Sequence, residues 1–265
     1  MALARPDRAA VRAIGRNAAA AAKPIAAAGK IHAALLATAD HDLRTPLAAA
    51  KAAVDALRAS DATWKPEQVR ELAASADASL DQLTRLVDNL LDLSRLQAGK
   101  LPLRPGPTEV ADVVAHALAS LGPPAAQIRV MIPAATPLAV ADPALLERVL
   151  VNLLSNAIRY SPAGTPATVT ASALGDRVEL RIIDQGPGVS QTDRDLIFAP
   201  FQRPDGEDGP PGTGLGLALS RGLTEAMHGT LTPEDTPGGG LTMIVSLPAA
   251  GSVPAPAAPA APFPA

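Results

Sequence analysis

The sequence contains no cysteine and very few aromatic residues. The absence of cysteine excludes disulfides, zinc–thiolate sites, iron–sulfur clusters and a thiol nucleophile. The hydrophobic cores must be built from leucine, valine, isoleucine and alanine, so an aromatic side chain next to a motif is informative. The aromatic residues are Trp64, Tyr160, Phe198, Phe201 and Phe263.

The chain also lacks a long hydrophobic run and an excess of positive charge. A membrane-spanning helix needs about 20 strongly apolar residues, but the apolar stretch over 17–37 is mostly alanine and contains Lys23, Pro24 and Lys30. Arginines scattered over 5–16 interrupt any signal-peptide core. The net charge of −3 argues against nucleic-acid binding. We therefore expect a cytoplasmic chain with no membrane segment and no nucleic-acid partner.

A chain of 265 residues is long enough for about two domains. We expect the boundary near residue 100, because Gly99 and a proline-rich stretch over 101–107 cannot continue a helix. The predicted division is an alanine-rich lead-in over 1–30, a helical domain over 31–99, a mixed domain over 100–248 and a disordered proline- and alanine-rich tail over 249–265.

Two helices are predicted in the helical domain. Apolar residues recur three or four positions apart from Ala33 to Leu57 and again from Leu72 to Leu93, with a break near 60–66. A hairpin of these helices leaves apolar surface uncovered unless a second copy packs against it, which favours a homodimeric four-helix bundle. Three residues widen the apolar face of the second helix beyond a two-stranded seam: Leu80, Val87 and Leu91.

The second domain mixes helical and strand patterns. Apolar and polar residues alternate over 177–183, as in a half-buried strand, and 167–174 is expected to pair with it across a Gly-Asp turn. We expect helices layered on an antiparallel sheet. The other predicted elements are helices over 110–121, 143–160 and 214–228 and strands over 128–132, 138–140 and 240–247.

His41 is a candidate phosphoryl acceptor on the first helix. It lies two positions from Leu43 on the apolar seam, about 200° around the helix, so its imidazole is expected to face solvent, as is Thr45 one turn on. A neutral imidazole nitrogen can accept a phosphoryl group, and the carboxylate of Asp42 can hold the proton of the other nitrogen. An exposed histidine beside an aspartate is also an ordinary solvated helix face. Pro46 favours a special function because an interior proline is costly.

Two asparagines mark the helix predicted over 143–160. Asn152, Asn156 and Tyr160 share one of its faces. Asparagine prefers helix caps to helix interiors, and an amide oxygen can ligate Mg²⁺. The alternative is that both side chains cap nearby loops. The expected buried side consists of Leu145, Val149 and Leu153.

An Asp-Gln-Gly-Pro-Gly sequence over 184–188 follows the strand predicted over 177–183. The carboxylate of Asp184 can accept a hydrogen bond from an exocyclic amine such as that of adenine. Glycines at 186 and 188 let the backbone approach a flat ring. The same sequence is also typical of a turn.

A glycine-rich loop over 212–217 precedes the last predicted helix. Free backbone N–H groups at such a helix start favour phosphate binding. The loop lacks the Lys-Ser/Thr ending of a P-loop, and no Rossmann strand precedes it. On its own it is a weak signal.

Taken in order, these motifs resemble those of the sensor histidine kinases of bacterial two-component systems, over about residues 31–248. His41 to Leu47 also resembles the phosphoacceptor sequence of the potassium-responsive branch. The matching boxes are the phosphoacceptor box, the N box, the first glycine box, the F box and the second glycine box, at His41–Leu47, Asn152–Tyr160, Asp184–Gly188, Ile197–Phe201 and Gly212–Leu217.

The resemblance implies an α+β fold. A helical-hairpin dimerisation domain, a four-helix bundle in the dimer, would be followed by an α/β sandwich ATP-binding domain of the GHKL (Bergerat) type, shared with Hsp90, MutL and gyrase. The implied activity is that of an ATP-dependent protein histidine kinase. His41 would receive the γ-phosphoryl group with Asp42 as base, and Thr45 would orient water for dephosphorylating an aspartate-bearing response regulator, the implied partner.

The resemblance also implies ATP and Mg²⁺ as ligands of the second domain. Asn156 would be the main Mg²⁺ ligand, and Asn152 would support phosphate or metal. Asp184 would hold the adenine amine, Tyr160 would contact the ring, and the amides over 214–216 would cradle phosphates. The remaining residues that the resemblance places at the nucleotide are Arg159, Gly186, Gly188, Phe201, Gly212, Thr213, Gly214, Leu215 and Gly216.

Several positions depart from the family pattern. Arg159 replaces the usual lysine, which changes how a phosphate is held. Ala199 replaces an acidic residue of the F box, Asp40 replaces a common serine, and the lid over 202–211 is short. Two other functions stay open: an ATP-dependent conformational machine of the Hsp90 or MutL kind, and a non-catalytic dimeric scaffold.

Overall fold

The structure is a computed structural model that describes residues 43–59, 64–202 and 214–251. The chain divides into two compact units between Arg85 and Leu86. The division falls inside the long helix α2, Pro66–Gln97. One helix therefore contributes residues to both units.

The first unit contains a helix over 43–58 and the N-terminal part of α2. Both helices were predicted from the spacing of apolar residues, and the structure confirms them within the described ranges. Ala50 is buried, and the indole N–H of Trp64 donates to the carbonyl oxygen of Ala56 at 3.1 Å. This hydrogen bond fixes the chain that enters α2 against the end of the preceding helix.

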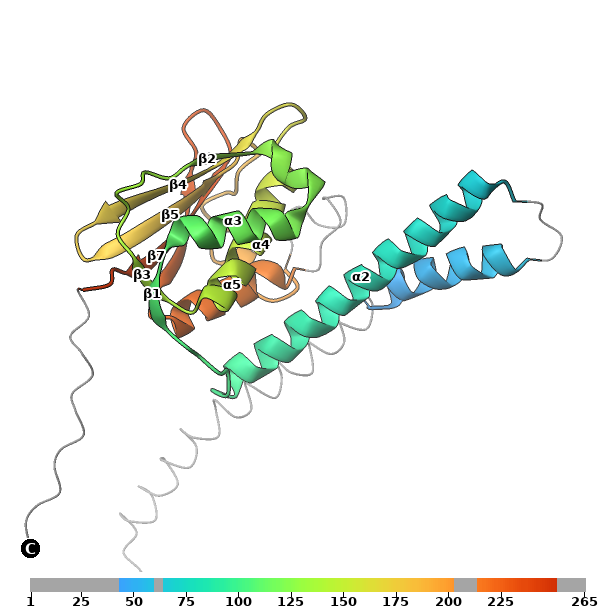
Figure 1. Cartoon of the computed structure of the whole chain (residues 1–265), viewed down its shortest axis with the longest axis horizontal. Coiled ribbons are helices and arrows are strands. Elements are labelled where there is room, and N and C mark those ends of the chain that lie inside the picture. Colours follow the sequence, from blue (N-terminus) through green and yellow to red (C-terminus); the bar gives the residue numbers. More distant parts are fainter. Residues whose placement is uncertain (1–42, 60–63, 203–213, 252–265) are drawn as a thin grey trace, which may run out of the picture. The chain divides into compact units, whose positions relative to one another are not determined.

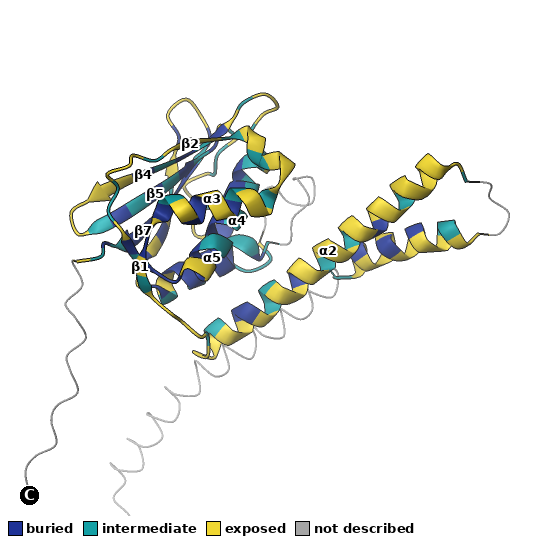
Figure 2. Ribbon diagram, in the orientation of Figure 1, coloured by how far each residue is buried: buried dark blue, intermediate teal, exposed yellow. Residues whose placement is uncertain are grey.

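Large apolar side chains on these two helices remain exposed in the single chain, as the mostly exposed ribbons of Figure 2 show. Their burial would have to come from another surface, because exposed apolar area in water costs free energy. These residues are Leu47, Val54, Val69, Leu80, Val87 and Leu91.

The second unit is built on a five-stranded sheet with strand order β2-β4-β5-β7-β6. Helices α3, α4 and α5 cover one face of this sheet (Figure 1). The fold is the α/β sandwich that the resemblance implied. The sheet strands are β2 (Ile128–Met131), β4 (Ala167–Leu174), β5 (Arg177–Ile183), β6 (Thr230–Asp235) and β7 (Leu241–Pro248), and the helices are α3 (Val110–Leu121), α4 (Pro143–Tyr160) and α5 (Gly216–Ala226).

Four short elements complete the unit. Strands β1 (Gly106–Thr108) and β3 (Ala139–Ala141) pair antiparallel apart from the main sheet. The 3-10 helices η1 (Pro123–Gln127) and η2 (Leu196–Phe198) follow α3 and precede α5 in sequence.

The expectation of an antiparallel sheet was wrong at one edge. The pairs β4–β5, β5–β7 and β6–β7 are antiparallel, but β2 pairs with β4 in parallel. The chain between these two strands runs through β3 and α4, which is a crossover of the kind that parallel pairing needs. Strand β6 was not predicted, because only Leu231 among its six residues is buried and it contains a proline.

Helix α4 has a well-defined start. The side chain of Asp142 accepts hydrogen bonds from the N–H groups of Ala144 and Leu145, and Pro143 occupies the first helical position. The other carboxylate oxygen of Asp142 accepts the N–H of Arg104 at 2.8 Å. This cap fixes where α4 begins and ties it to the proline-rich segment that follows α2.

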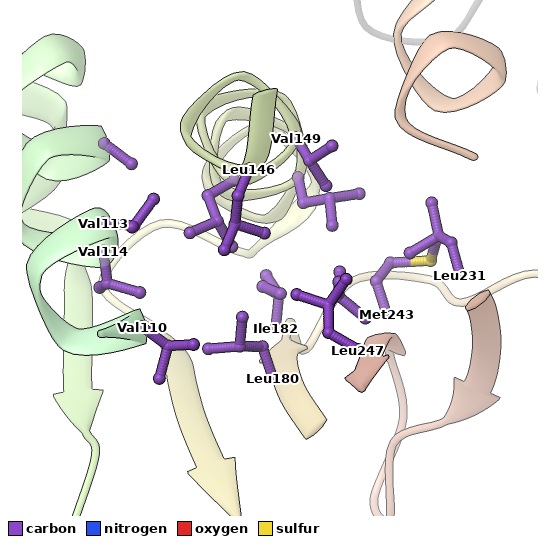
Figure 3. Packing of buried hydrophobic residues seen from close by; sticks show 14 of the residues in the cluster. Val110, Val113, Val114, Leu146, Val149, Leu180, Ile182, Leu231, Met243 and Leu247 are labelled. Carbon is purple, nitrogen blue, oxygen red and sulfur yellow. The ribbon is translucent and has the colours of Figure 1, made fainter. Parts of the chain in front are cut away.

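The hydrophobic core lies between the helices and the sheet. Figure 3 shows Leu146 and Val149 of α4 above Leu180 and Ile182 of β5 and Leu247 of β7. The side chains of β5 alternate strictly between buried and half-buried, as the sequence pattern predicted. The core face of α4 therefore points to the sheet.

The ordered domain continues a little past residue 248, where the tail was expected to begin. The N–H of Ala249 donates to the carbonyl oxygen of Asp176 at 2.8 Å, and the N–H of Ala250 donates to that of Leu138 at 2.7 Å. These bonds join the end of β7 to two neighbouring turns. None of the helices in the described ranges is long and apolar enough to cross a bilayer.

Replacing Leu180 with alanine should lower the free energy of unfolding by about 2–5 kcal/mol, because Leu180 is 0% exposed at the centre of the core. Leu174→Ala is the matched control: Leu174 ends the neighbouring strand and is 61% exposed, so the expected change is within about 0.5 kcal/mol. Urea denaturation of both variants measures the difference, and equal losses would contradict this description of the core.

Candidate functional site

Asp184 lies directly after β5, and its carboxylate is held by two separate backbone segments. Its Oδ1 atom accepts the N–H of Gly186 at 2.9 Å and the N–H of Leu241 at 3.0 Å. Both bonds go to Oδ1, and within the described part of the chain Oδ2 receives no further hydrogen bond. The carboxylate is thus fixed in place with one oxygen available to a ligand.

Burial raises the pKa of Asp184 above that of an ordinary aspartate, and the hydrogen bonds from Gly186 and Leu241 oppose this rise. The residue is only 6% exposed. Ionising a buried carboxylate costs free energy unless a donor or a positive group compensates. A ligand with a hydrogen-bond donor at Oδ2 would lower that cost.

Glycines allow three segments to meet around Asp184. A Cβ atom on Gly186 would lie 2.6 Å from the carbonyl oxygen of Tyr160, at the end of α4. Gly240 has a φ of 112°, and a Cβ there would overlap the carbonyl oxygen of Asp184. A Cβ on Gly188 would lie 3.1 Å from the carbonyl oxygen of Gly240. The first glycine box therefore packs between the end of α4 and the turn that precedes β7.

Helix α4 carries the predicted polar face. Asn152, Asn156 and Tyr160 are half-buried, whereas Arg159 is exposed. The Nδ2 group of Asn152 donates to Ser220 Oγ of α5 at 3.1 Å. The hydrophobic side predicted for this helix is confirmed, since Leu145, Val149 and Leu153 are buried.

Helix α5 starts close to Asn152. A Cβ on Gly216, the first residue of α5, would overlap the amide group of Asn152. Leu215 is buried, so its side chain is not available to a ligand. Because residue 216 has no side chain, the amide of Asn152 can pack against the first residue of α5.

Phe201 and Gly214 lie on either side of residues 203–213. The N–H of Phe201 donates to the carbonyl oxygen of Gly214 at 3.0 Å, and a Cβ on Gly214 would lie 2.8 Å from Phe201 Cα. Phe201 has a φ of 62°, which is rare for a residue with a side chain. The last residue of the F box thus contacts Gly214, in the middle of the second glycine box. Gly212 and Thr213 lie outside the described residues.

The phosphoacceptor motif is only partly described. Thr45 is an exposed residue of the helix over 43–58. His41 and Asp42 lie outside the described residues, so their predicted roles rest on the sequence.

The sequence analysis missed several residues that shape the site. Gly240 and the N–H of Leu241 support Asp184, and Ser220 holds Asn152. Phe198 is buried with the guanidinium of Arg221 4.9 Å from its ring centroid. The role of Gly240 could have been predicted from the three consecutive glycines over 238–240, because such a run often marks a tight turn or a close backbone approach.

These residues suit a purine nucleotide. A fixed carboxylate oxygen can accept an exocyclic amine, and the amide side chains of Asn152 and Asn156 offer oxygens that Mg²⁺ prefers. The expectation that glycines 186 and 188 leave room for a flat ring is not met on their bare sides, where the backbone of Tyr160 and of Gly240 lies instead. The N-terminus of α5 adds backbone N–H groups at a helix start, where phosphate commonly binds. All of these groups belong to the second unit.

Comparison with known families defines the class of protein. The model of the histidine kinase-, DNA gyrase B- and HSP90-like ATPases matches residues 141–251. The model of the His Kinase A (phospho-acceptor) domain matches residues 32–99. The chain therefore joins a phospho-acceptor domain to an ATPase domain of this type.

Individual relatives give the family. Sensor protein KdpD of Mycobacterium tuberculosis (strain ATCC 25618 / H37Rv) is 45% identical over 232 residues, which cover 85% of this chain and 27% of that protein. Sensor protein KdpD of Escherichia coli (strain K12) is 36% identical over 220 residues, which cover 83% of this chain and 24% of that protein. The chain belongs to the bacterial sensor histidine kinases, and it spans about a quarter of the length of these KdpD relatives.

Solved structures share the fold. Acinetobacter baumannii histidine kinase AdeS superposes with a TM-score of 0.62 at 25% identity, covering 80% of this chain and 98% of that chain. Full-length ShkA, solved in complex with AMPPNP, superposes with a TM-score of 0.59 at 28% identity. The match covers 82% of this chain and 47% of the ShkA chain.

Replacing Asp184 with asparagine should make the protein relatively more stable as the pH rises. A raised pKa means that the folded wild type binds a proton more tightly than the unfolded chain. Wild-type stability therefore falls as the pH rises from the unfolded value of about 3.9 through the folded pKa of Asp184, and the neutral amide of the variant has no such cost. The variant's stability relative to wild type should increase over that window and stay constant above it.

Urea denaturation between pH 3 and pH 8 measures the Asp184→Asn effect. Asp112→Asn, at an exposed aspartate of α3, is the control and should follow the wild-type curve. Parallel curves for wild type and Asp184→Asn would contradict the desolvation of this carboxylate.

Proposed function

We propose that this chain is an ATP-dependent protein histidine kinase that phosphorylates itself on His41 and passes the phosphoryl group to an aspartate of a response regulator. The observation that carries the proposal is the carboxylate of Asp184, fixed by two backbone amides in an ATPase-type domain that is joined to a phospho-acceptor domain. The proposal includes dephosphorylation of the regulator by the same chain.

The nucleotide roles that we propose are supported by the geometry around Asp184 in the second unit. Asp184 Oδ2 would accept the adenine amine, since both backbone amides bind Oδ1. Tyr160 would contact the ring, and the amides around Gly214 and Gly216 would bind phosphate oxygens. The AMPPNP complex of the structurally similar ShkA supports a nucleotide in this type of domain.

Asn156 is proposed as the main Mg²⁺ ligand, with Asn152 beside it. When bound, Mg²⁺ would neutralise charge on the transferred phosphoryl group and on the leaving oxygen. The two amides lie one turn apart on α4, whose start is fixed by Asp142 and whose other face is buried. The protein's own contribution is to hold both amide groups on a rigid helix.

At the phosphoacceptor, Asp42 would hold the proton of one imidazole nitrogen of His41 and so raise the nucleophilicity of the other. The free nitrogen forms a bond to the γ-phosphorus, the bond from that phosphorus to the bridging oxygen breaks, and ADP departs with the electron pair. In the transfer step, a carboxylate oxygen of the regulator's aspartate forms the new bond to phosphorus. The bond between phosphorus and the His41 nitrogen breaks, its electron pair stays on the nitrogen, and His41 is regenerated.

We also propose that the first unit forms a homodimeric four-helix bundle. Support comes from the large apolar side chains of its helices that stay exposed in the single chain, including Leu47, Val54 and Leu80. The domains would be those of the sequence analysis, 31–99 for dimerisation and phosphotransfer and 100–248 for ATP binding. The compact second unit starts earlier, at Leu86, because the last turns of α2 pack with it.

His41→Gln should abolish phosphorylation of the chain by ATP and change the ATP affinity by less than about twofold, because the acceptor and the pocket lie on separate domains. Phosphorylation is measured by incubation with γ-labelled ATP followed by an acid-lability assay, and the ATP affinity is measured by calorimetry. His116→Gln, at an exposed histidine of α3, is the control and should be phosphorylated normally. Undiminished acid-labile phosphate on His41→Gln would refute the assignment, and none on the wild type would favour a conformational machine or a scaffold.

Thr45→Ala should slow regulator dephosphorylation by roughly tenfold or more while leaving autophosphorylation nearly unchanged, because the hydroxyl orients a water and takes no part in ATP binding. Both rates are measured on one preparation. Thr84→Ala, at an exposed threonine of α2, should alter neither. A parallel fall in both rates with a lower melting temperature would show a structural role for Thr45 instead.

A further inference from the structure

Ser220 is a fully buried hydroxyl on the face of α5 that meets α4. It is 0% exposed, and its Oγ accepts a hydrogen bond from Asn152 Nδ2 at 3.1 Å. Gly216 lies one turn earlier on α5, and a Cβ there would overlap the oxygen of the same amide group and would lie 2.7 Å from its nitrogen. The amide of Asn152 is therefore confined between a buried hydroxyl and a bare backbone.

We propose that Ser220 is a positioning residue that fixes the orientation of the Asn152 amide, so that Nδ2 is bound inside the protein and Oδ1 is left as the group offered to the metal-bearing end of the nucleotide. This rests on the proposed nucleotide site. An asparagine side chain presents a donor at one end and an acceptor at the other. Only the acceptor end can bind Mg²⁺ or a water of its shell.

The orientation determines which partner Asn152 can have. With Nδ2 on Ser220, the amide offers oxygen, which suits a cation and repels phosphate oxygens. With the amide turned over, the NH₂ group would face the site and would suit phosphate but not metal. In the structure Nδ2 is the end bonded to Ser220, and the proposal therefore places Oδ1, and with it Asn152, on the metal side, a choice that the sequence left open.

A buried hydroxyl on the same helix lacks this connection. Thr224 lies one turn after Ser220 and is also 0% exposed, but its Oγ1 donates to the carbonyl oxygen of Ser220 at 2.7 Å. That bond stays within α5 and reaches no residue of the site. Thr224 therefore provides a control for the general cost of deleting a buried hydroxyl from this helix.

Ser220→Ala should weaken ATP binding about fivefold in the presence of Mg²⁺, as expected for the loss of one hydrogen bond, and by less than about twofold in excess EDTA. Ser220→Thr retains the hydroxyl and should bind as the wild type does. Thr224→Val should lower the melting temperature and leave both affinities unchanged. Calorimetric titration with ATP, with and without Mg²⁺, supplies these values.

Two further measurements separate positioning from a structural effect. In an Asn152→Ala background, Ser220→Ala should cause no additional loss of Mg²⁺-dependent affinity, because its only route to the metal has been removed. In the ligand-free wild type, the side-chain NH₂ resonances of Asn152 should be slow to exchange with solvent, and Ser220→Ala should remove that protection.

Equal losses with and without Mg²⁺, additive losses in the double variant, or an unchanged Ser220→Ala would each overturn the role of Ser220. These outcomes leave the nucleotide site itself intact, since the wild type still binds ATP. A wild type that binds no ATP would refute the proposed function and this inference together.

Discussion

The carboxylate of Asp184 is the constraint on which the site depends. One of its oxygens is bound by the N–H groups of Gly186 and Leu241, which come from two turns far apart in sequence. These bonds hold the first glycine box against the turn before β7, and Gly186 in turn abuts the end of α4. The hydrophobic core beneath, with α4 packed on β5 and β7, keeps these segments in register. The free oxygen is positioned by the fold before any ligand arrives.

The carboxylate that is proposed to bind the ligand, that of Asp184, is also one whose ionisation costs free energy in the folded protein. Burial disfavours the charged form of Asp184, and two hydrogen bonds offset only part of that cost. A hydrogen-bond donor on a ligand would offset more of the cost of ionising Asp184. Without a ligand, the folded protein carries that cost. Sites that must bind a partner often carry such unsatisfied groups. Gly216 and Gly240 are also required by close contacts. A side chain at Gly216 would overlap the amide of Asn152, and one at Gly240 would overlap the carbonyl oxygen of Asp184.

Much of this could be predicted from the sequence where the pattern was local. Helix α4 and the hairpin of β4 and β5 show clear periods of 3.6 and 2, and both were confirmed. Strand β6 and the parallel pairing of β2 were not predicted, because one has a single buried residue and the other depends on a distant partner. Asp184 was proposed as a nucleotide-binding residue from its place after a strand, and that role stays a prediction. Leu241 and Ser220 act through bonds to residues 57 and 68 positions away, which no local spacing reveals.

The most direct test of the account is the choice between two purine nucleotides by the unmodified protein. Adenine presents an amine where guanine presents a carbonyl oxygen, and the free oxygen of Asp184 can accept a hydrogen bond only from the former. Calorimetric titration with ATP and then with GTP, in the presence of Mg²⁺, should give an affinity for GTP at least about tenfold weaker, because a buried carboxylate would face a second acceptor. Equal affinities would contradict the assignment of Asp184 and, with it, the organisation of the site around that carboxylate.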